Sequence, residues 1–177
     1  MRLHLTTNAV RCLRGLCLCM GSASMFLQPV LAQVTGDAAE MDRLRAKAEE
    51  AIGSDDPEGA AMNMGRAALM AKRLGQLNRK DPRTARLYQG AESLFRSQEH
   101  AYRAMALFRR AGGHLPASTG VCRSLELAQG SVNHALTDLE PESPPPDSLT
   151  DHAKQWRESA DDWAVVVASM IIDYQCR

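Results

Sequence analysis

ARLYQGAESLFRSQEHAYRAMALFRRAGGHLP, at residues 85–116, contains two apolar stripes with helical spacing. In each stripe apolar residues recur at steps of three and four positions: Tyr88, Ala91 and Phe95, then Ala104, Phe108 and Ala111. This periodicity is typical of helices that bury one face. Pro116 follows the second stripe and is incompatible with a continuing helix. The pattern therefore predicts two helices within residues 84–113, packed on each other as a pair.

The spacing of these residues resembles that of the tetratricopeptide repeat, a helix pair of about 34 residues. In that family the first helix carries large side chains where Tyr88 and Phe95 stand. Its partner carries small side chains where Ala104 and Ala111 stand, so the two helices approach closely. The resemblance implies an all-α protein of antiparallel helical hairpins. It also implies a non-enzymatic scaffold or adaptor for protein–protein interactions.

The first 32 residues have the three parts of a secretory signal peptide. Arginines precede a mostly apolar segment at residues 15–27, and small residues at its end indicate cleavage after Ala32. A lipoprotein and a membrane anchor are the alternatives. They are disfavoured because no small residue precedes Cys17 or Cys19, and because polar residues interrupt the apolar segment. We expect an exported protein, periplasmic or secreted, with no stable membrane insertion after cleavage.

Cleavage would remove three of the five cysteines and leave only Cys122 and Cys176. Cysteines of exported proteins usually pair, since the compartment is oxidising. The sequence therefore predicts a Cys122–Cys176 disulfide. Residues 33–177 are numerous enough for one all-helical domain with its own core.

The charge of the chain is unevenly distributed, although the 21 basic residues equal the 21 acidic ones in number. Residues 37–58 have a net charge of −5, residues 66–123 of +9 and residues 126–177 of −7. The first explanation is that the acidic ends neutralise the basic centre within the fold, or that these are solvated helix faces. The second is that the centre binds an acidic segment of another protein.

Under the second explanation, arginines of the central block are the partner-binding residues: Arg86, Arg96, Arg103, Arg109 and Arg110. Nucleic acid is disfavoured as the partner because the chain is expected to be exported. In addition, its basic residues are not interleaved with several aromatic side chains that would stack on bases.

Residues 38–77 are predicted to form the first helix pair. Alanine and charged residues dominate residues 38–52, which favours a helix there. A second helix then begins after Asp56, an N-cap acceptor, with Pro57 at its first position, and extends to about residue 77. Its apolar residues recur at the intervals of the second stripe above, which indicates a degenerate earlier copy of the repeat: Ala60, Met64 and Ala67.

Residues 118–176 are predicted to form a helical hairpin closed by the disulfide. Glycines at 112 and 113 end the preceding helix, and the next begins near Ser118. The prolines of residues 140–147 make a stiff connector. Ser148 and Asp151 then resemble a capping box that opens the last helix.

The last helix carries an apolar seam with steps of four and three: Leu149, Ala153, Trp156, Ala160, Trp163, Val167, Met170 and Tyr174. Antiparallel packing of this helix on the preceding one would bring Cys122 beside Cys176. Residues 165–172, VVVASMII, are apolar on all sides of the helix. This predicts burial on two sides or a homodimer face.

The sequence lacks the motifs of the common catalytic, metal and phosphate sites. The histidines beyond the leader stand far apart, without the spacing of metal ligands: His100, His114, His134 and His152. Asp161 and Asp162 are adjacent, so they project in different directions from a helix. No catalytic, cofactor-binding or metal-binding residue is therefore predicted.

A second resemblance concerns residues 122–176. This segment is similar to the disulfide-linked helix hairpin of plant pectin methylesterase and invertase inhibitors, which are exported helical bundles. The residues that carry the resemblance are VVASMIIDYQC, which end at Cys176. It implies an alternative function, the inhibition of a hydrolase by occlusion.

Overall fold

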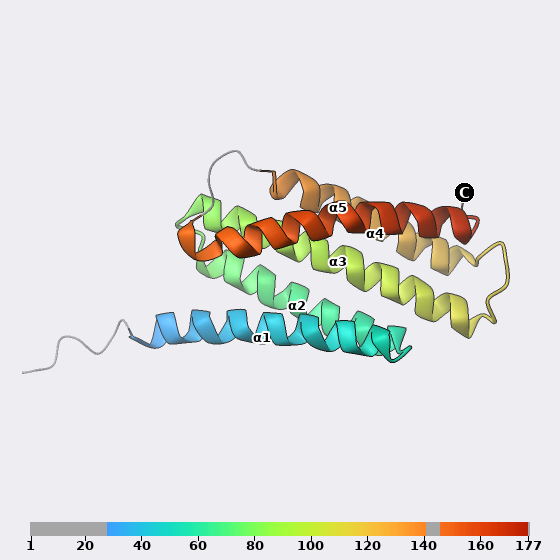
Figure 1. Ribbon diagram of the computed structural model, residues 1–177, viewed down its shortest axis with the longest axis horizontal. Coiled ribbons are helices and arrows are strands. Elements are labelled where there is room, and N and C mark those ends of the chain that lie inside the picture. Colours follow the sequence, from blue (N-terminus) through green and yellow to red (C-terminus); the bar gives the residue numbers. More distant parts are fainter. Residues whose placement is uncertain (1–27, 141–145, 177) are drawn as a thin grey trace, which may run out of the picture.

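The computed structural model describes residues 28–140 and 146–176, and this part of the chain is all-helical (Figure 1). Its elements are α1 (Gln28–Gly53), α2 (Pro57–Leu77), α3 (Pro82–Arg110), α4 (Thr119–Asp138), the short 3-10 helix η1 (Asp147–Leu149) and α5 (Thr150–Asp173). The predicted fold class, all-α with antiparallel hairpins, is confirmed.

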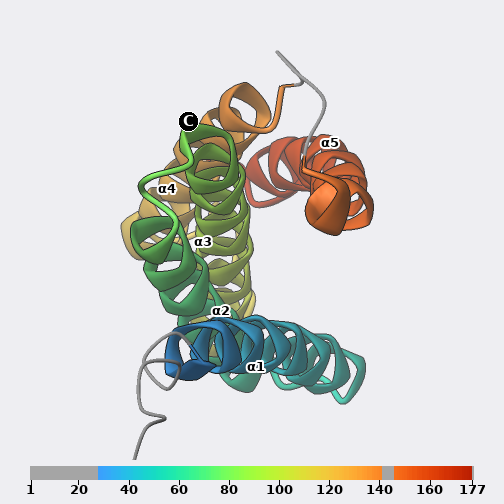
Figure 2. The ribbon, with the colours of Figure 1, turned by 90° about the vertical axis from the view of Figure 1, so that its left-hand side faces the viewer.

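Each helix packs on the next one along the chain, and α5 also packs on α3 (Figure 2). The long central helix α3 therefore has neighbours on several sides. Thirteen of its residues are buried. This position explains why α3 carries both small and aromatic side chains, since each neighbour requires a different surface.

The ends of the helices follow from local chemistry. Asp56 accepts a hydrogen bond from the backbone N–H of Gly59 at 2.9 Å, and Pro57 occupies the first turn of α2. Asp81 caps α3 in the same way, and its hydrogen bond from Thr84 lowers the pKa of the Asp81 carboxyl. Beyond α3, Gly112 and Gly113 have positive φ angles of 80° and 69°. Glycine adopts this conformation without strain, so the chain turns here as predicted.

The predicted helix pair within residues 84–113 is wrong, because α3 is one continuous helix. No glycine or proline interrupts residues 96–103, where the two helices would have had to turn. Two ion pairs also span this region, from Arg96 to Glu99 at 2.7 Å and from Arg103 to Glu99 at 2.5 Å. Pairs at these spacings stabilise a helix.

The aromatic packing differs from the prediction for the same reason. Phe108 lies on the same helix as Tyr88 and Phe95 and does not pack on them. Its ring instead stacks on Tyr174 after α5, with ring centroids 4.3 Å apart. Tyr88 and Phe95 contact Trp156 of α5, at centroid distances of 5.8 and 6.4 Å.

Trp156 belongs to the largest apolar cluster of the described residues. Its side chain is buried, and α1, α2 and α3 contribute the surrounding residues, among them Leu44, Met64 and Phe95. The predicted seam of α5 is thereby confirmed at its buried positions, Trp156, Ala160 and Val167. Residues of the first and last helices therefore share one buried cluster.

The predicted disulfide is present in the structure. Cys122 near the start of α4 and Cys176 after α5 are bonded, with their Cα atoms 5.3 Å apart. The hydrogen bond from the Ala117 N–H to the Tyr174 carbonyl, at 2.9 Å, ties the same two segments together. The antiparallel arrangement of α4 and α5 places these residues side by side.

The predicted capping box at Ser148 and Asp151 is wrong. Ser148 lies within η1, and α5 begins at Thr150 with Leu149 at its N-cap and no side-chain cap. Most of the predicted connector, residues 141–145, lies outside the described residues.

Most of the expected signal peptide, residues 1–27, also lies outside the described residues. Helix α1 begins at Gln28 and continues past the expected cleavage point after Ala32. Cleavage there would leave Gln33–Gly53 as the first helix. Among the described helices, none combines the length and the apolarity that crossing a membrane requires.

Candidate functional site

The five arginines predicted to bind a partner do not share one surface. Arg86 donates a hydrogen bond to the carbonyl of Thr137 at the end of α4, at 3.1 Å. Arg109 pairs with Asp55 in the turn between α1 and α2, at 2.8 Å. The structure brings the other three together along one side of α3, facing α2: Arg96, Arg103 and Arg110.

These three arginines line a groove between α2 and α3 with a volume of about 580 Å³. Four arginines and two glutamates line it in total, so the groove carries an excess of positive charge: Arg66, Arg96, Arg103 and Arg110 against Glu58 and Glu99. We call this surface the α2–α3 groove.

Glu99 is the buried acid of the α2–α3 groove. Arg96 donates to one of its carboxylate oxygens and Arg103 to the other. Gly65 of α2 provides the space, since a Cβ atom there would lie 2.9 Å from Glu99 Cδ. Glu99 thus holds two guanidinium groups in a fixed position, and its single charge cannot neutralise both.

Arg66 differs from the other arginines of the groove. It is exposed on α2, and within residues 28–140 and 146–176 no ion pair joins it to an acidic side chain. Arg110, by contrast, pairs with Glu58 at 3.2 Å, with both side chains exposed. Exposed pairs of this kind contribute little stability and exchange readily with other acids.

The explanation by internal neutralisation holds for part of the basic block. Asp55 and Glu58, from the acidic segment at residues 37–58, pair with Arg109 and Arg110, and Asp37 lies 3.1 Å from Arg73. Arg96 and Arg103 pair within the basic block itself. Among residues 126–140 and 146–176, no acidic side chain pairs with an arginine of the α2–α3 groove, so the positive excess there remains.

The sequence analysis did not identify the residues with which α2 lines the groove. Met62 and Leu69 are exposed there, at 62% and 52%, on either side of Arg66. Their seven-residue separation equals that of Arg96 and Arg103 on α3. This shared spacing can be read from the sequence, but it indicates a common surface only when α2 and α3 are known to pack side by side.

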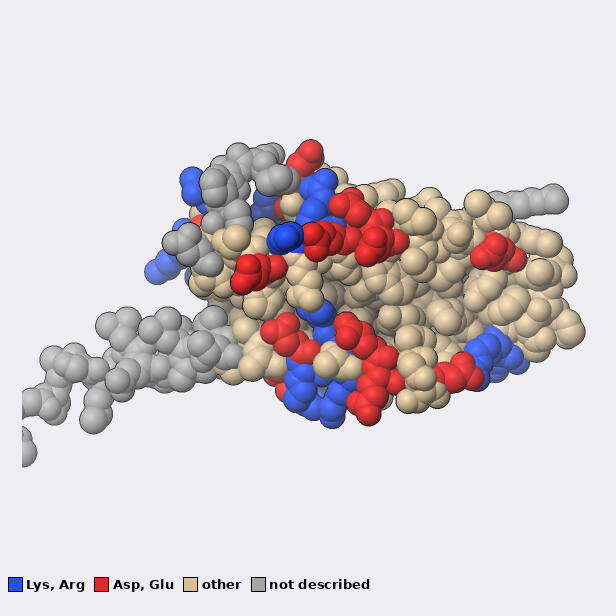
Figure 3. All heavy atoms as spheres, in the orientation of Figure 1, with Lys and Arg blue, Asp and Glu red and all other residues tan. Residues whose placement is uncertain are grey.

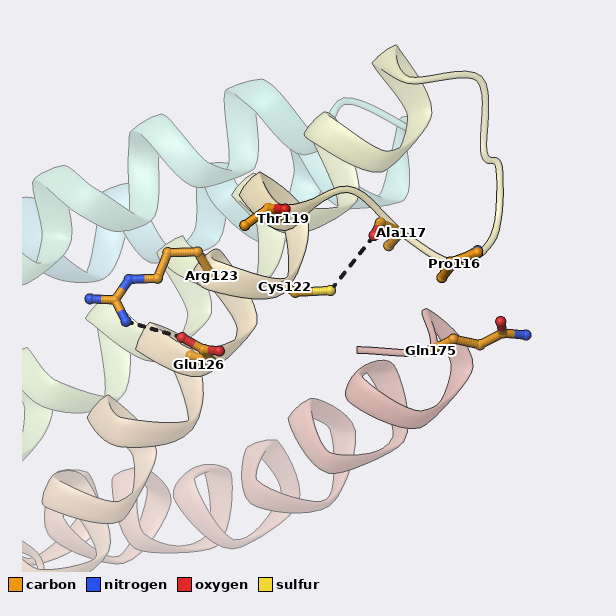
Figure 4. A pocket seen from close by; sticks show the side chains of 7 residues that line it. All are labelled: Pro116, Ala117, Thr119, Cys122, Arg123, Glu126 and Gln175. Carbon is orange, nitrogen blue, oxygen red and sulfur yellow. Dashed lines mark hydrogen bonds and ion pairs between the residues drawn. The ribbon is translucent and has the colours of Figure 1, made fainter. Parts of the chain in front are cut away.

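A second hollow lies beside the disulfide, between the start of α4 and the end of the chain (Figure 4). Arg123 turns toward Glu126 and pairs with it at 3.0 Å, whereas Gln175 points away from the other lining side chains. The polar groups therefore do not converge on a common point. This hollow offers a less defined binding surface than the α2–α3 groove.

The histidines are not brought together. His152 lies 3.4 Å from Asp42, and His100 is half-buried in α3, where burial lowers the pKa of its imidazole. Within residues 28–140 and 146–176, no three acidic, histidine or cysteine side chains gather where they would hold a metal ion.

The expected burial of residues 165–172 on two sides is wrong for part of this segment. Val167 is buried, but Val165 and Ile172 are 70% and 75% exposed. On the face seen in Figure 3, the surface over this half of α5 is almost free of charged side chains, which gather instead over the first half of α5 and along α1. The homodimer expected from this apolar segment stays a prediction.

Comparison of the chain with protein-family models, with curated proteins and with solved structures gave no match. The geometry of the α2–α3 groove is therefore the best guide to the function of this protein.

Proposed function

We propose that this protein is an exported, non-enzymatic scaffold or adaptor that binds an acidic segment of another protein in the α2–α3 groove. The observation that carries the proposal is the positive excess of the groove, which has four arginines and two glutamates. Arginine suits this role because its planar guanidinium binds carboxylates through two parallel hydrogen bonds. Its charge also persists at any ordinary pH.

The internal ion pairs leave binding capacity in the groove. Arg96 and Arg103 each direct one N–H group at Glu99, whereas a guanidinium has five. The Arg103 side chain is half exposed, so its remaining donors are accessible to a partner. Glu99 orders both side chains before binding, which reduces the entropy lost when a partner docks.

Fluorescence anisotropy with a labelled glutamate-rich peptide of about 20 residues tests this proposal. We expect binding to weaken steeply between about 0.01 M and about 1 M salt, because the screening length falls from roughly 30 Å to roughly 3 Å. The double variant Arg66→Gln/Arg103→Gln should bind at least about tenfold more weakly, a change of about 1.4 kcal/mol.

The matched control is Arg123→Gln/Lys154→Gln, which removes the same charge from exposed sites on α4 and α5. It should bind the peptide nearly as well as the wild type. Equal losses in both double variants would mean that overall charge, not the groove, attracts the peptide. Absence of binding by the wild type at low salt would contradict the proposed function.

Inhibition of a hydrolase is the second candidate function. The observation that favours it is the disulfide between α4 and α5, which joins the two helices into a covalently closed hairpin. Mixing the mature protein with a pectin methylesterase or with an invertase at equal concentrations tests it. A loss of hydrolase activity would support inhibition, and unchanged rates with both enzymes would contradict it.

A further inference from the structure

We infer that the acidic segment bound in the α2–α3 groove is an amphipathic helix that repeats one acidic and one apolar residue every seven positions. The inference rests on the proposed function and goes further, because it specifies the conformation and the residue pattern of the partner. Three features of the groove support it: its basic wall, its apolar wall and its floor.

The basic wall is a row of arginines with a regular spacing. Arg96, Arg103 and Arg110 follow one another at seven-residue intervals on α3. Seven residues are almost two turns of an α-helix, so the three side chains lie on one face about 10.5 Å apart along the axis.

The apolar wall has the same repeat. Met62 and Leu69 are also seven residues apart, and both are exposed on α2. Ion pairs between the two helices show their antiparallel register, with Glu58 beside Arg110 at 3.2 Å and Lys72 beside Glu92 at 3.9 Å.

In this register Leu69 lies at the level of Arg96, and Met62 lies at the level of Arg103. Each level of the groove therefore offers one apolar side chain and one arginine. The level between them holds Arg66 and the buried Glu99. A partner that places one apolar and one acidic residue at each level would satisfy both walls.

The floor of the groove is made of small residues. Ala61 and Ala106 are buried there, and Gly65 has no side chain. Small residues at a helix contact allow a short distance between the helix axes, at the low end of the usual 8–10 Å range. A third helix can therefore lie along the groove between the two walls.

An extended peptide does not fit this repeat. A strand advances about 3.3 Å per residue, so a step of about 10.5 Å takes three residues. Successive side chains of a strand point to opposite faces, so residues three apart would face opposite ways. A helix returns to the same face after seven residues at the required distance, which is the mode of recognition by an amphipathic helix in a groove.

Three peptides of identical composition and about 21 residues, or three heptads, test the inference by anisotropy. The first repeats glutamate and leucine every seven positions on adjacent stripes of a helix. The second has the same residues in an order that spreads both types around the helix. All three peptides contain one proline, which is terminal in the first two. The third peptide has the first pattern, but its proline has changed places with the central residue, where it breaks the helix at a cost of about 3 kcal/mol.

We expect the first peptide to bind at least about tenfold more tightly than the other two. Circular dichroism of the mixture should show added helix only with the first peptide. The variant Met62→Gln/Leu69→Gln should remove this preference, and because both side chains are exposed its thermal midpoint should stay close to that of the wild type.

Equal, salt-sensitive binding of all three peptides would overturn the helix inference and leave the proposed function standing. Binding of none of the three peptides would contradict both the helix inference and the proposed function. Binding of vesicles of an anionic phospholipid, without binding of any peptide, would assign the groove to a membrane surface and overturn the inference.

Discussion

Gly90 of α3 and Leu139 at the end of α4 lie so close that a Cβ atom at Gly90 would come within 2.6 Å of Leu139 Cγ. Leu139 is buried in the main core, so it has little room to move. The close approach of α3 and α4 at this level therefore depends on glycine.

Gly90→Ala should lower the free energy of unfolding by about 1–3 kcal/mol through overpacking, despite the better helix propensity of alanine. The matched control is Gly130→Ala in α4, where the added Cβ atom would meet no atom within 4 Å. This control should raise stability by about 0.5–1 kcal/mol. Urea unfolding of both variants measures the difference, and stabilisation by both substitutions would refute the close contact.

The Cys122–Cys176 bond should be the main covalent constraint on α5. The two cysteines are 54 positions apart in the sequence, and a disulfide that closes a loop of this size stabilises a protein by roughly 4 kcal/mol. Cys122→Ser/Cys176→Ser should therefore lower the thermal midpoint markedly. Intact mass after alkylation of the unreduced mature protein should show no modified thiol, and two modified thiols would contradict the disulfide.

Trp156, not Phe108, should be the aromatic residue on which stability depends most. Its side chain is 1% exposed and contacts the rings of Tyr88 and Phe95, so Trp156→Ala should cost roughly 3–5 kcal/mol. Phe108 is only partly buried, against Tyr174, and Phe108→Ala should cost less than half as much. Thermal unfolding of the two variants compares them directly. A larger loss for Phe108→Ala would mean that the core is arranged differently.

Stability should fall in alkaline solution because of Tyr102. Burial, together with the nearby charge of Glu49, raises the pKa of its phenol from 10.0 to about 12. As the pH rises, the unfolded chain therefore loses this proton before the folded chain does. The contribution of the protonated Tyr102 to the free energy of unfolding is complete below pH 10 and is lost progressively toward pH 12. Tyr102→Phe should show a shallower decline over this window in urea unfolding. The same slope in both proteins would exclude Tyr102 as the cause.

Local signals allowed much of the fold to be predicted from the sequence. Asp56 and Pro57 mark the start of α2, Gly112 and Gly113 follow the end of α3, and the seam around Trp156 faces the core. Each of these depends on nearby residues alone. The disulfide could also be predicted, because removal of the expected leader leaves only two cysteines.

The continuity of α3 was not predicted because periodicity records which residues share a face, not how many helices carry them. Tyr88 and Phe95 face Trp156, while Ala104 belongs to the cluster with Val121 and Leu125 of α4. Two stripes on two faces of one helix produce the same spacing as two helices. The absence of a turn residue in residues 96–103 was the deciding signal.

The α2–α3 groove was predicted only in part. The arginine block was evident from the sequence, but Arg86 and Arg109 contact other parts of the fold. Met62 and Leu69 became candidates through the register of two helices, which sequence spacing alone does not provide.

The location of a bound peptide on the mature protein decides whether the α2–α3 groove is the binding site. Titration of the ¹⁵N-labelled protein with the heptad-patterned peptide would follow the backbone amide signals of the whole chain. We expect shifts at Gly65, Arg103 and Ala106, which line the α2–α3 groove, with little change at Ala168 and Ile172 on the exposed face of α5. Shifts confined to α5, or spread evenly over the surface, would contradict it.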